Sequence, residues 1–203
     1  MLNKIPVLDK GYVALISSSL DAKAMRELES RHFNNKINKQ LWELATLTLE
    51  IRCPIFVQIF FQQVGLSVIN VVEKKVECYT PDLSEIGTGN HQTDKEIAEY
   101  MKQTTEALIL TALAFEKDGL NRFTANSLMP VSVYNTIIVS GNLQKWINLL
   151  KKKTPSPISM YVDTIYEIAE NEWGELGLFI GRNNDKKESK KESKKESVSN
   201  SSS

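Results

Sequence analysis

Residues 45–63 read ATLTLEIRCPIFVQIFFQQ, and this stretch decides the fold. Its first seven residues alternate between apolar and polar side chains, which is typical of a strand with one buried face. Pro54 ends the strand and can serve as the first position of a helix, and Ile55–Gln63 continue that helix. The stretch therefore predicts a half-buried strand followed directly by a helix. The face that we expect to be buried carries Ala45, Leu47, Leu49 and Ile51.

The rest of the chain also alternates between strand-like and helix-like segments. Strands are predicted at 12–16, 67–79 and 131–139, where β-branched and apolar residues gather. Helices are predicted at 22–32, 97–115, 121–127, 143–150 and 158–169. This order predicts one α+β domain with a central mixed or antiparallel sheet flanked by helices. The longest helix carries an apolar stripe of Ile97, Tyr100, Met101, Thr104, Leu108, Ala112 and Phe115.

The composition is typical of one compact domain without a membrane span. The chain has 203 residues, of which 41% are hydrophobic, and its 25 Lys and Arg balance its 25 Asp and Glu. The balance gives no case for a nucleic-acid or membrane partner, and no apolar run approaches the roughly 20 residues of a membrane span. The N-terminus has no apolar signal-peptide core, and two cysteines make no disulfide framework. We therefore expect a cytoplasmic protein.

The C-terminal end differs in composition from the rest. Residues 186–197 repeat KKES three times, and a run of Ser and Asn follows. Such a segment buries no apolar area that would offset the entropy of ordering it. We therefore divide the chain into a folded domain at residues 1–182 and a disordered tail at residues 183–203. A weak contact between this tail and an acidic partner is the alternative interpretation.

The common motifs of catalysis and metal binding are absent from the sequence. There is no metal-ligand spacing, glycine-rich dinucleotide loop, P-loop or serine nucleophile elbow. His32 and His91 stand in unrelated polar contexts and are interpreted as surface residues. Cys53 lies at a strand end, where a buried structural thiol is a better interpretation than a nucleophile. Lys151–Lys153 are interpreted as a solvated helix end, with an anion contact as the alternative.

Three segments stand in a specific order and spacing. They read LDKGYV at 8–13, LTLEIRCPIFV at 47–57, and LMP at 128–130 followed by VSGNLQKW at 139–146. Together they resemble the flavin-dependent thymidylate synthases, namely that family's opening strand, its strand–Pro–helix unit, and its Leu-Pro strand with a Gly-Asn-Leu-Arg-x-Trp helix start. The likeness extends from about Val7 to Ala169.

The resemblance implies a fold, an activity and partners. Members of this family convert dUMP to dTMP with FAD, NADPH and methylene-tetrahydrofolate, and they form homotetramers whose active sites are assembled from several chains. The resemblance therefore implies that family's α+β fold, a pyrimidine nucleotide as ligand and FAD as cofactor. It also implies a homo-oligomer, or a hetero-oligomer with an active paralogue.

The chain departs from the family at its signature, Arg-His-Arg-x-x-Ser-x-Asn-Glu-x-Ser-x-Arg-Tyr. The family's signature begins nine residues after the proline that corresponds to Pro54. The Arg-His-Arg positions are here Gln63, Val64 and Gly65, and Asn70 alone keeps a signature residue. The other signature positions carry Val68, Val71, Glu73, Lys75 and Val76.

The substitutions continue outside the signature. Only Asn142 and Asn148, whose family counterparts contact the flavin, match residue for residue. No arginine falls on a family phosphate or flavin position, although guanidinium is the group best suited to hold phosphate. Losing three or four charge-assisted hydrogen bonds costs about 5–10 kcal/mol of nucleotide binding. The remaining family positions, which carry histidine or arginine there, hold Leu44, Asn126, Lys153 and Pro157 here.

Three hypotheses follow from these residues. The first, which we favour, is a non-catalytic relative that keeps the scaffold and an oligomer interface and has no catalytic residues. The second is a divergent flavin-dependent pyrimidine-nucleotide methyltransferase, in which Asn142 and Asn148 hold FAD, Lys75 and Lys153 hold the phosphate, and Gln63 contacts the base. The third is an unrelated α+β interaction module. No hypothesis includes a metal site.

Overall fold

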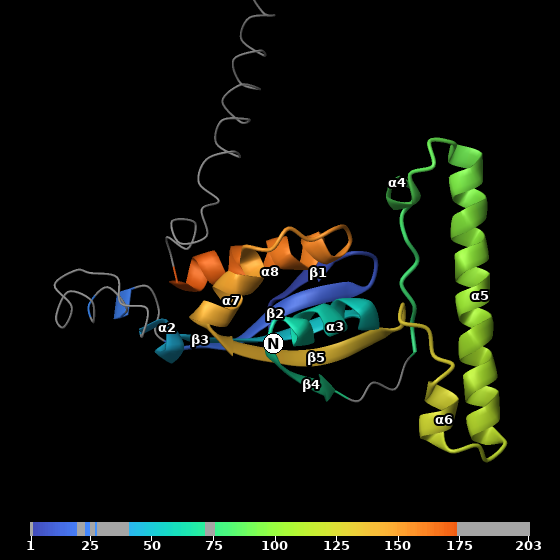
Figure 1. Cartoon of the computed structure of the whole chain (residues 1–203), viewed down its shortest axis with the longest axis horizontal. Helices are drawn as coiled ribbons and strands as arrows, with labels where there is room; N and C mark the ends of the chain where they lie inside the picture. The colour runs from blue at the N-terminus through green and yellow to red at the C-terminus, as the bar shows by residue number, and fades with distance from the viewer. Residues whose placement is uncertain (1, 20–22, 25–26, 28–40, 72–75, 174–203) are drawn as a thin grey trace, which may run out of the picture.

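One five-stranded sheet organises the fold (Figure 1). The computed structural model describes residues 2–19, 23–24, 27, 41–71 and 76–173. The strand order is β1-β2-β3-β5-β4, and every neighbouring pair is antiparallel. The predicted α+β class is confirmed. The strands are β1 (Lys4–Val7), β2 (Gly11–Ser18), β3 (Thr46–Pro54), β4 (Ser67–Val71) and β5 (Tyr134–Asn142).

β3 lies in the middle of the sheet, and its alternating pattern has the predicted consequence. Leu47, Leu49 and Ile51 are fully buried on one face, while the residues between them are partly exposed on the other. Pro54 ends the strand as predicted and takes the N-cap position of α3 (Ile55–Gln63), one residue before the first helical position. The strand-to-helix unit is therefore confirmed.

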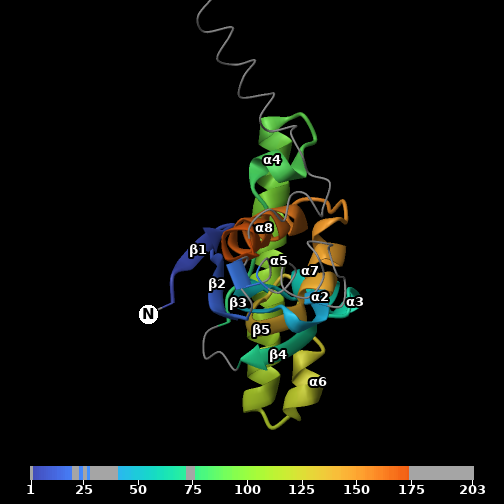
Figure 2. The ribbon, with the colours of Figure 1, turned by 90° about the vertical axis from the view of Figure 1, so that its left-hand side faces the viewer.

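A single hydrophobic core lies between this face of β3 and three helices. α3, α7 (Leu143–Leu150) and α8 (Ile158–Trp173) all contribute buried side chains to it. Trp146 of α7 is fully buried, and its Nε1 donates to the carbonyl oxygens of Leu47 and Gly141, both at 3.1 Å. Figure 2 looks along the strands and shows α7 and α8 on the same side of the sheet.

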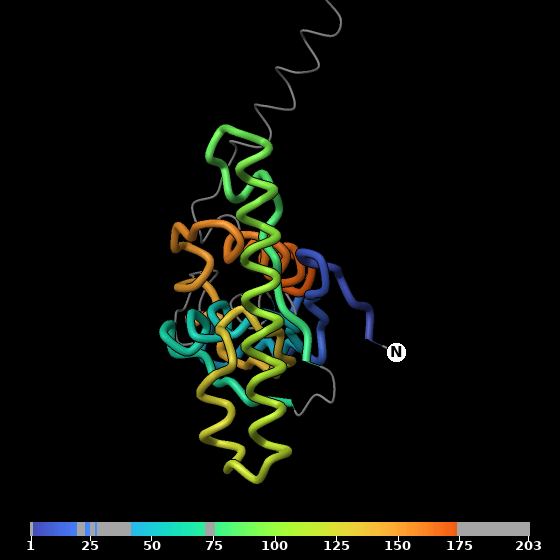
Figure 3. The backbone as a smooth tube through the Cα atoms, turned by 90° about the vertical axis from the view of Figure 1, so that its right-hand side faces the viewer, coloured from blue at the N-terminus to red at the C-terminus, as the bar shows by residue number. Residues whose placement is uncertain are grey.

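The segment between β4 and β5 stands beside one end of the sheet (Figures 1 and 3). It holds α4 (Leu83–Ile86), α5 (His91–Lys117) and α6 (Arg122–Asn126). The predicted long helix is confirmed and extends over 27 residues. It begins where it does because Asn90 caps it, with its side chain accepting hydrogen bonds from the backbone N–H groups of the next turn.

The apolar stripe of α5 is not covered by the described part of this chain. Tyr100, Met101, Leu108 and Phe115 are 72%, 44%, 38% and 45% exposed. Ala112 is the one stripe residue that is buried. The helix instead buries a neighbouring face, with Asp94 and Ile109 among its buried residues. Periodicity therefore identified the helix and its apolar stripe, but the stripe does not face the core.

Several predicted segments differ in extent from the structure or lie outside the described residues. β4 ends at Val71, residues 72–75 are outside the described part, and Cys78 then forms an isolated bridge with Val133. β5 begins only at Tyr134. The predicted helix at 22–32 is described only at 23–24 and 27, and the predicted tail at 183–203 is not described.

A short helix, α2 (Leu41–Leu44), precedes β3. Among the helices in the described ranges, none combines the length and apolar character that crossing a membrane requires.

Candidate functional site

The residues at the start of the signature form the turn that ends α3. Gln63 is the exposed last residue of the helix, and Val64 is its C-cap. Gly65 has φ +80° and donates its backbone N–H to the carbonyl oxygen of Gln62 at 3.1 Å. Only glycine adopts such a φ without strain, so an arginine side chain at this position would be strained. The Gln63-Val64-Gly65 segment therefore has a structural explanation as a helix end.

The two asparagines that match the family lie at different places on α7. Asn142 ends β5 and caps α7, and its Oδ1 accepts the backbone N–H of Lys145 at 3.0 Å. Asn148 is exposed, and its Oδ1 accepts from Nε2 of Gln144 at 3.0 Å. Six residues separate them, which is about 240° around a helix axis. Lys153 is exposed beyond the end of the helix.

The structure does not bring these side chains together in a pocket within the described part of one chain. Three pockets lie in the described part of the chain, and none of them is lined by Gln63, Asn142, Asn148 or Lys153. The carboxamide oxygens of both asparagines are engaged in local hydrogen bonds. Lys75 lies outside the described residues.

A pocket of about 390 Å³ lies between α6 and the β4–β5 edge of the sheet. Apolar side chains form much of its lining, and such a mixture of apolar walls with a few polar groups is typical of small-molecule sites. We call it the α6 pocket. Its polar lining residues are Asn70, Arg122, Asn126, Tyr134 and Asn135.

Three carboxamides are joined by hydrogen bonds at one side of the α6 pocket. Asn135 Nδ2 donates to Gln58 Oε1 at 3.1 Å and to Asn70 Oδ1 at 2.9 Å. Gln58 Nε2 also donates to Asn70 Oδ1, at 2.8 Å. Gln58 is 8% exposed, so it is the buried member of the three and holds the other two by its hydrogen bonds. A network in which each buried polar group has a partner holds its members in one orientation.

Arg122 brings a cation to the α6 pocket, one helical turn before Asn126. Asn126 is the position at which the resemblance leads one to expect an arginine. The side chain of Arg122 is 70% exposed, and its Nε lies 3.8 Å from Oε1 of Glu116. The fold thus places an arginine in the same pocket as Asn126.

Tyr134 lines the α6 pocket beside the end of β3. Its side chain is a neutral phenol. It is 2% exposed, and its hydroxyl donates to Asp9 Oδ1 at 2.5 Å. Burial and the hydrogen bond to Asp9 both raise the pKa of Tyr134. The phenol therefore keeps its proton at neutral pH and serves to anchor β5 to the β1–β2 turn.

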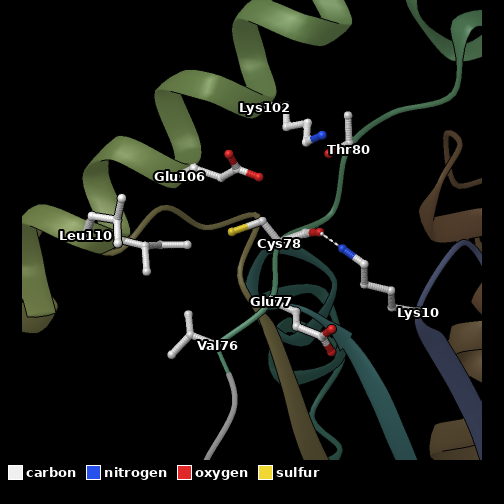
Figure 4. A pocket seen from close by; sticks show the side chains of 9 residues that line it. Lys10, Val76, Glu77, Cys78, Thr80, Lys102, Glu106 and Leu110 are labelled. Atoms are coloured by element: carbon white, nitrogen blue, oxygen red, sulfur yellow. Dashed lines mark hydrogen bonds between the residues drawn. The ribbon is translucent and has the colours of Figure 1, made fainter.

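A second pocket, of about 370 Å³, lies between α5 and residues 76–80 (Figure 4). Lys10 Nζ donates to the carbonyl oxygen of Cys78 at 3.0 Å, and Lys102 and Glu106 reach in from α5. Burial is the main cause that raises the pKa of Cys78, so its thiol is protonated at neutral pH. Cys53 is fully buried, as predicted for a structural thiol. No group of three or more His, Cys, Asp or Glu residues in the described ranges is arranged to hold a metal ion.

Sequence reasoning missed two residues that line the α6 pocket, Asn135 and Arg122, and the buried Gln58 that is hydrogen-bonded to its lining. Asn135 occupies an inward position of β5 in a series that otherwise reads Val133, Ile137 and Val139, and this break in the pattern was a usable signal. Arg122 had a weaker signal, since it lies four residues before Asn126. Gln58 gave none, because its position within an apolar helix does not reveal its partners.

Two solved structures have a similar fold. One is the UMP/dUMP methylase PolB from Streptomyces cacaoi bound with 5-Br UMP, with a TM-score of 0.69 and 16% identity over 88% of this chain and 98% of that one. The other is the same methylase bound with 5-Br dUMP, with a TM-score of 0.67 and 16% identity over 88% and 99%. No protein-family model and no curated protein sequence matches the chain. The chain thus has a fold similar to that of a UMP/dUMP methylase, at an identity that establishes the architecture alone.

Proposed function

We propose that this chain binds a pyrimidine nucleotide on the scaffold of the flavin-dependent thymidylate synthases and lacks most of their catalytic side chains. The observation that carries the proposal is the α6 pocket. It brings the one retained signature residue, Asn70, together with Arg122 and with Asn126. The fold likeness to PolB, which was solved with 5-Br UMP and 5-Br dUMP, supports the same ligand class.

The proposed loss of catalysis rests on the signature positions. The Arg-His-Arg triplet is replaced by the turn that ends α3, and its third position has a backbone conformation that disfavours any side chain. The flavin-matching asparagines do not converge on a pocket in one chain. Without the charged groups that hold dUMP beside a flavin, the fold alone does not catalyse the conversion of dUMP to dTMP.

The proposal includes self-association through α5. Its stripe of Tyr100, Met101, Leu108 and Phe115 is an exposed apolar surface on a helix about 40 Å long. The flanking positions hold both acidic and basic residues, including Glu99, Lys102, Glu106 and Lys117. A second copy of the helix, antiparallel to the first, can match such mixed charges. An active paralogue is the alternative partner for this surface.

The second candidate is an active, divergent flavin-dependent pyrimidine-nucleotide methyltransferase. It is favoured by one observation, namely that the two solved structures reported above are of a methylase. FAD supplies redox chemistry in that family, with NADPH and methylene-tetrahydrofolate as the other reactants. Because Asn142 and Asn148 form no site in one chain, this candidate requires a neighbouring chain to complete the flavin pocket.

Calorimetric titration of the full chain with UMP and with dUMP tests the proposal. We expect saturable binding of at least one of them, and no dTMP when FAD, NADPH and methylene-tetrahydrofolate are added. Formation of dTMP, together with the yellow colour of bound flavin, would favour the second candidate. Absence of binding to both nucleotides would overturn both candidates and leave an interaction module as the remaining hypothesis.

A further inference from the structure

The hydrogen bonds among the three carboxamides leave a defined pair of polar atoms for a ligand. Asn135 Nδ2 uses both of its hydrogens, and Asn70 Oδ1 accepts two hydrogen bonds. The three amides are therefore fixed in orientation relative to one another. No described residue is a hydrogen-bond partner of Asn70 Nδ2 or of Asn135 Oδ1. Both residues line the α6 pocket, so its wall includes one donor and one acceptor that have no partner among the described residues.

We infer that this Asn70–Asn135 pair recognises the ring of a pyrimidine, and that the α6 pocket selects its ligand by the base far more than by the phosphate. The inference rests on the proposed function, since it specifies how the same pocket would recognise its ligand. An adjacent donor and acceptor complement the O4 and N3–H groups of uracil. They also complement the N3 and N4 groups of cytosine, so the pair matches either pyrimidine, and the pyrimidine class itself comes from the proposed function.

The charge in the α6 pocket supports the second half of the inference. Among the described residues that line it, Arg122 is the only charged one. Its side chain is 70% exposed and lies near Glu116, so water and a competing carboxylate weaken its attraction for an anion. Arg122 therefore attracts a dianionic phosphate only weakly, whereas Asn135 and the exposed Asn70 are held by hydrogen bonds to Gln58, which is 8% exposed. Side chains that are already ordered before binding lose little conformational entropy when the ligand binds.

Titrations of the full chain with deoxyuridine and with dUMP separate the two contributions. We expect dUMP to bind no more than about tenfold tighter than deoxyuridine. The Arg122→Gln variant should remove that difference between the two ligands. A preference for dUMP of more than about 100-fold would overturn the inference, because the phosphate would then dominate recognition.

The variant Asn70→Asp tests the base contact itself. It keeps the oxygen that accepts from Gln58 and Asn135 and turns only the free Nδ2 into an oxygen. Both ligands should then bind about 10- to 100-fold more weakly, with the larger loss for dUMP, because the new carboxylate also repels its phosphate. Asn171→Asp makes the same chemical change at an exposed position of α8, far along the chain from the pocket residues, and should leave both affinities unchanged.

A modified ligand makes the same test on the unaltered protein. Methylation at N3 of deoxyuridine removes the ring donor and adds bulk, so the affinity should fall as it does for Asn70→Asp. If the methylated ligand and the variant both bind as well as their references, the inference fails while the proposed function stands. If the unaltered chain binds neither deoxyuridine nor dUMP, both fail.

Discussion

The hydroxyl of Tyr161 lies 2.0 Å from the position that a Cβ atom on Gly11 would occupy. Tyr161 is buried on α8 and donates its hydroxyl to the carbonyl oxygen of Arg52 on β3, at 3.0 Å. The start of β2 therefore passes so close to α8 that only a glycine fits. This contact joins the N-terminal hairpin, the central strand and the last helix.

The close contact predicts the effect of Gly11→Ala. The added methyl group would also meet the carbonyl oxygens of Val7 at 2.7 Å and Arg52 at 2.8 Å, so we expect a loss of about 1–3 kcal/mol of unfolding free energy. Urea denaturation measures it. Adding Tyr161→Phe should relieve only part of the loss, because the two carbonyl contacts remain. An unchanged urea midpoint for Gly11→Ala would contradict the packing described here.

The stripe on α5 predicts the behaviour of Leu108→Glu. A carboxylate in the centre of an apolar interface is desolvated without a partner, so we expect the oligomer to dissociate into monomers. Light scattering during size-exclusion chromatography measures the mass. Leu110→Glu is the matched control, since Leu110 is 67% exposed and lies about 200° around the helix from Leu108. The self-association proposal fails if the unaltered chain is a monomer, or if both variants dissociate equally.

Glu85 predicts a pH-dependent contribution to stability. This residue lies in a third pocket, at residues 79–85 and 156–160. Burial alone would raise the pKa of Glu85, but hydrogen bonds from Tyr79, the Asp82 backbone and Ser156 outweigh burial and lower it. A carboxyl whose pKa is lowered by folding stabilises the fold above its unfolded pKa, and this stabilisation is lost as pH falls through the folded value.

We therefore expect Glu85→Gln to be less stable than the unaltered chain at pH 7, by less than about 1 kcal/mol. The difference should shrink to nothing as the pH falls below about 4. Urea midpoints at several pH values measure it. A stability difference that stays constant between pH 7 and pH 3 would show that the charge of Glu85 has no part in it.

The two cysteines predict different rates of alkylation. Burial raises the pKa of both thiols, and Cys53 is fully buried whereas Cys78 is only partly so. Iodoacetamide should label Cys78 slowly at pH 7 and faster at pH 9, because the thiolate is the reactive form. Cys53 should be labelled only when the chain unfolds. Mass spectrometry of peptides follows both, and equal labelling of the two in the folded protein would contradict the burial of Cys53.

Much of the fold could be predicted from local pattern. The alternation at 45–51 identified β3 because a half-buried strand exposes every second side chain. The position of α5 relative to the sheet could not be predicted, since an apolar stripe indicates that something covers it but not what. The stripe residue Leu108 is 38% exposed, so the described part of this chain does not cover the stripe.

The candidate site could be predicted only in part. Resemblance located Asn70 and Asn126 and showed which charged groups are missing. It could not locate Asn135 beside Asn70, because the two are 65 residues apart and meet only through the pairing of β4 with β5. A long-range pairing of this kind leaves no local trace in the sequence.

The most direct test of the central claim is to locate a bound pyrimidine nucleotide. Crystals of the full chain soaked with 5-bromo-dUMP would show the bromine by its anomalous scattering. We predict one bromine site per chain in the α6 pocket, with the ring against Asn70 and Asn135 and the phosphate toward Arg122. A bromine site elsewhere, or none at saturating ligand, would contradict the account.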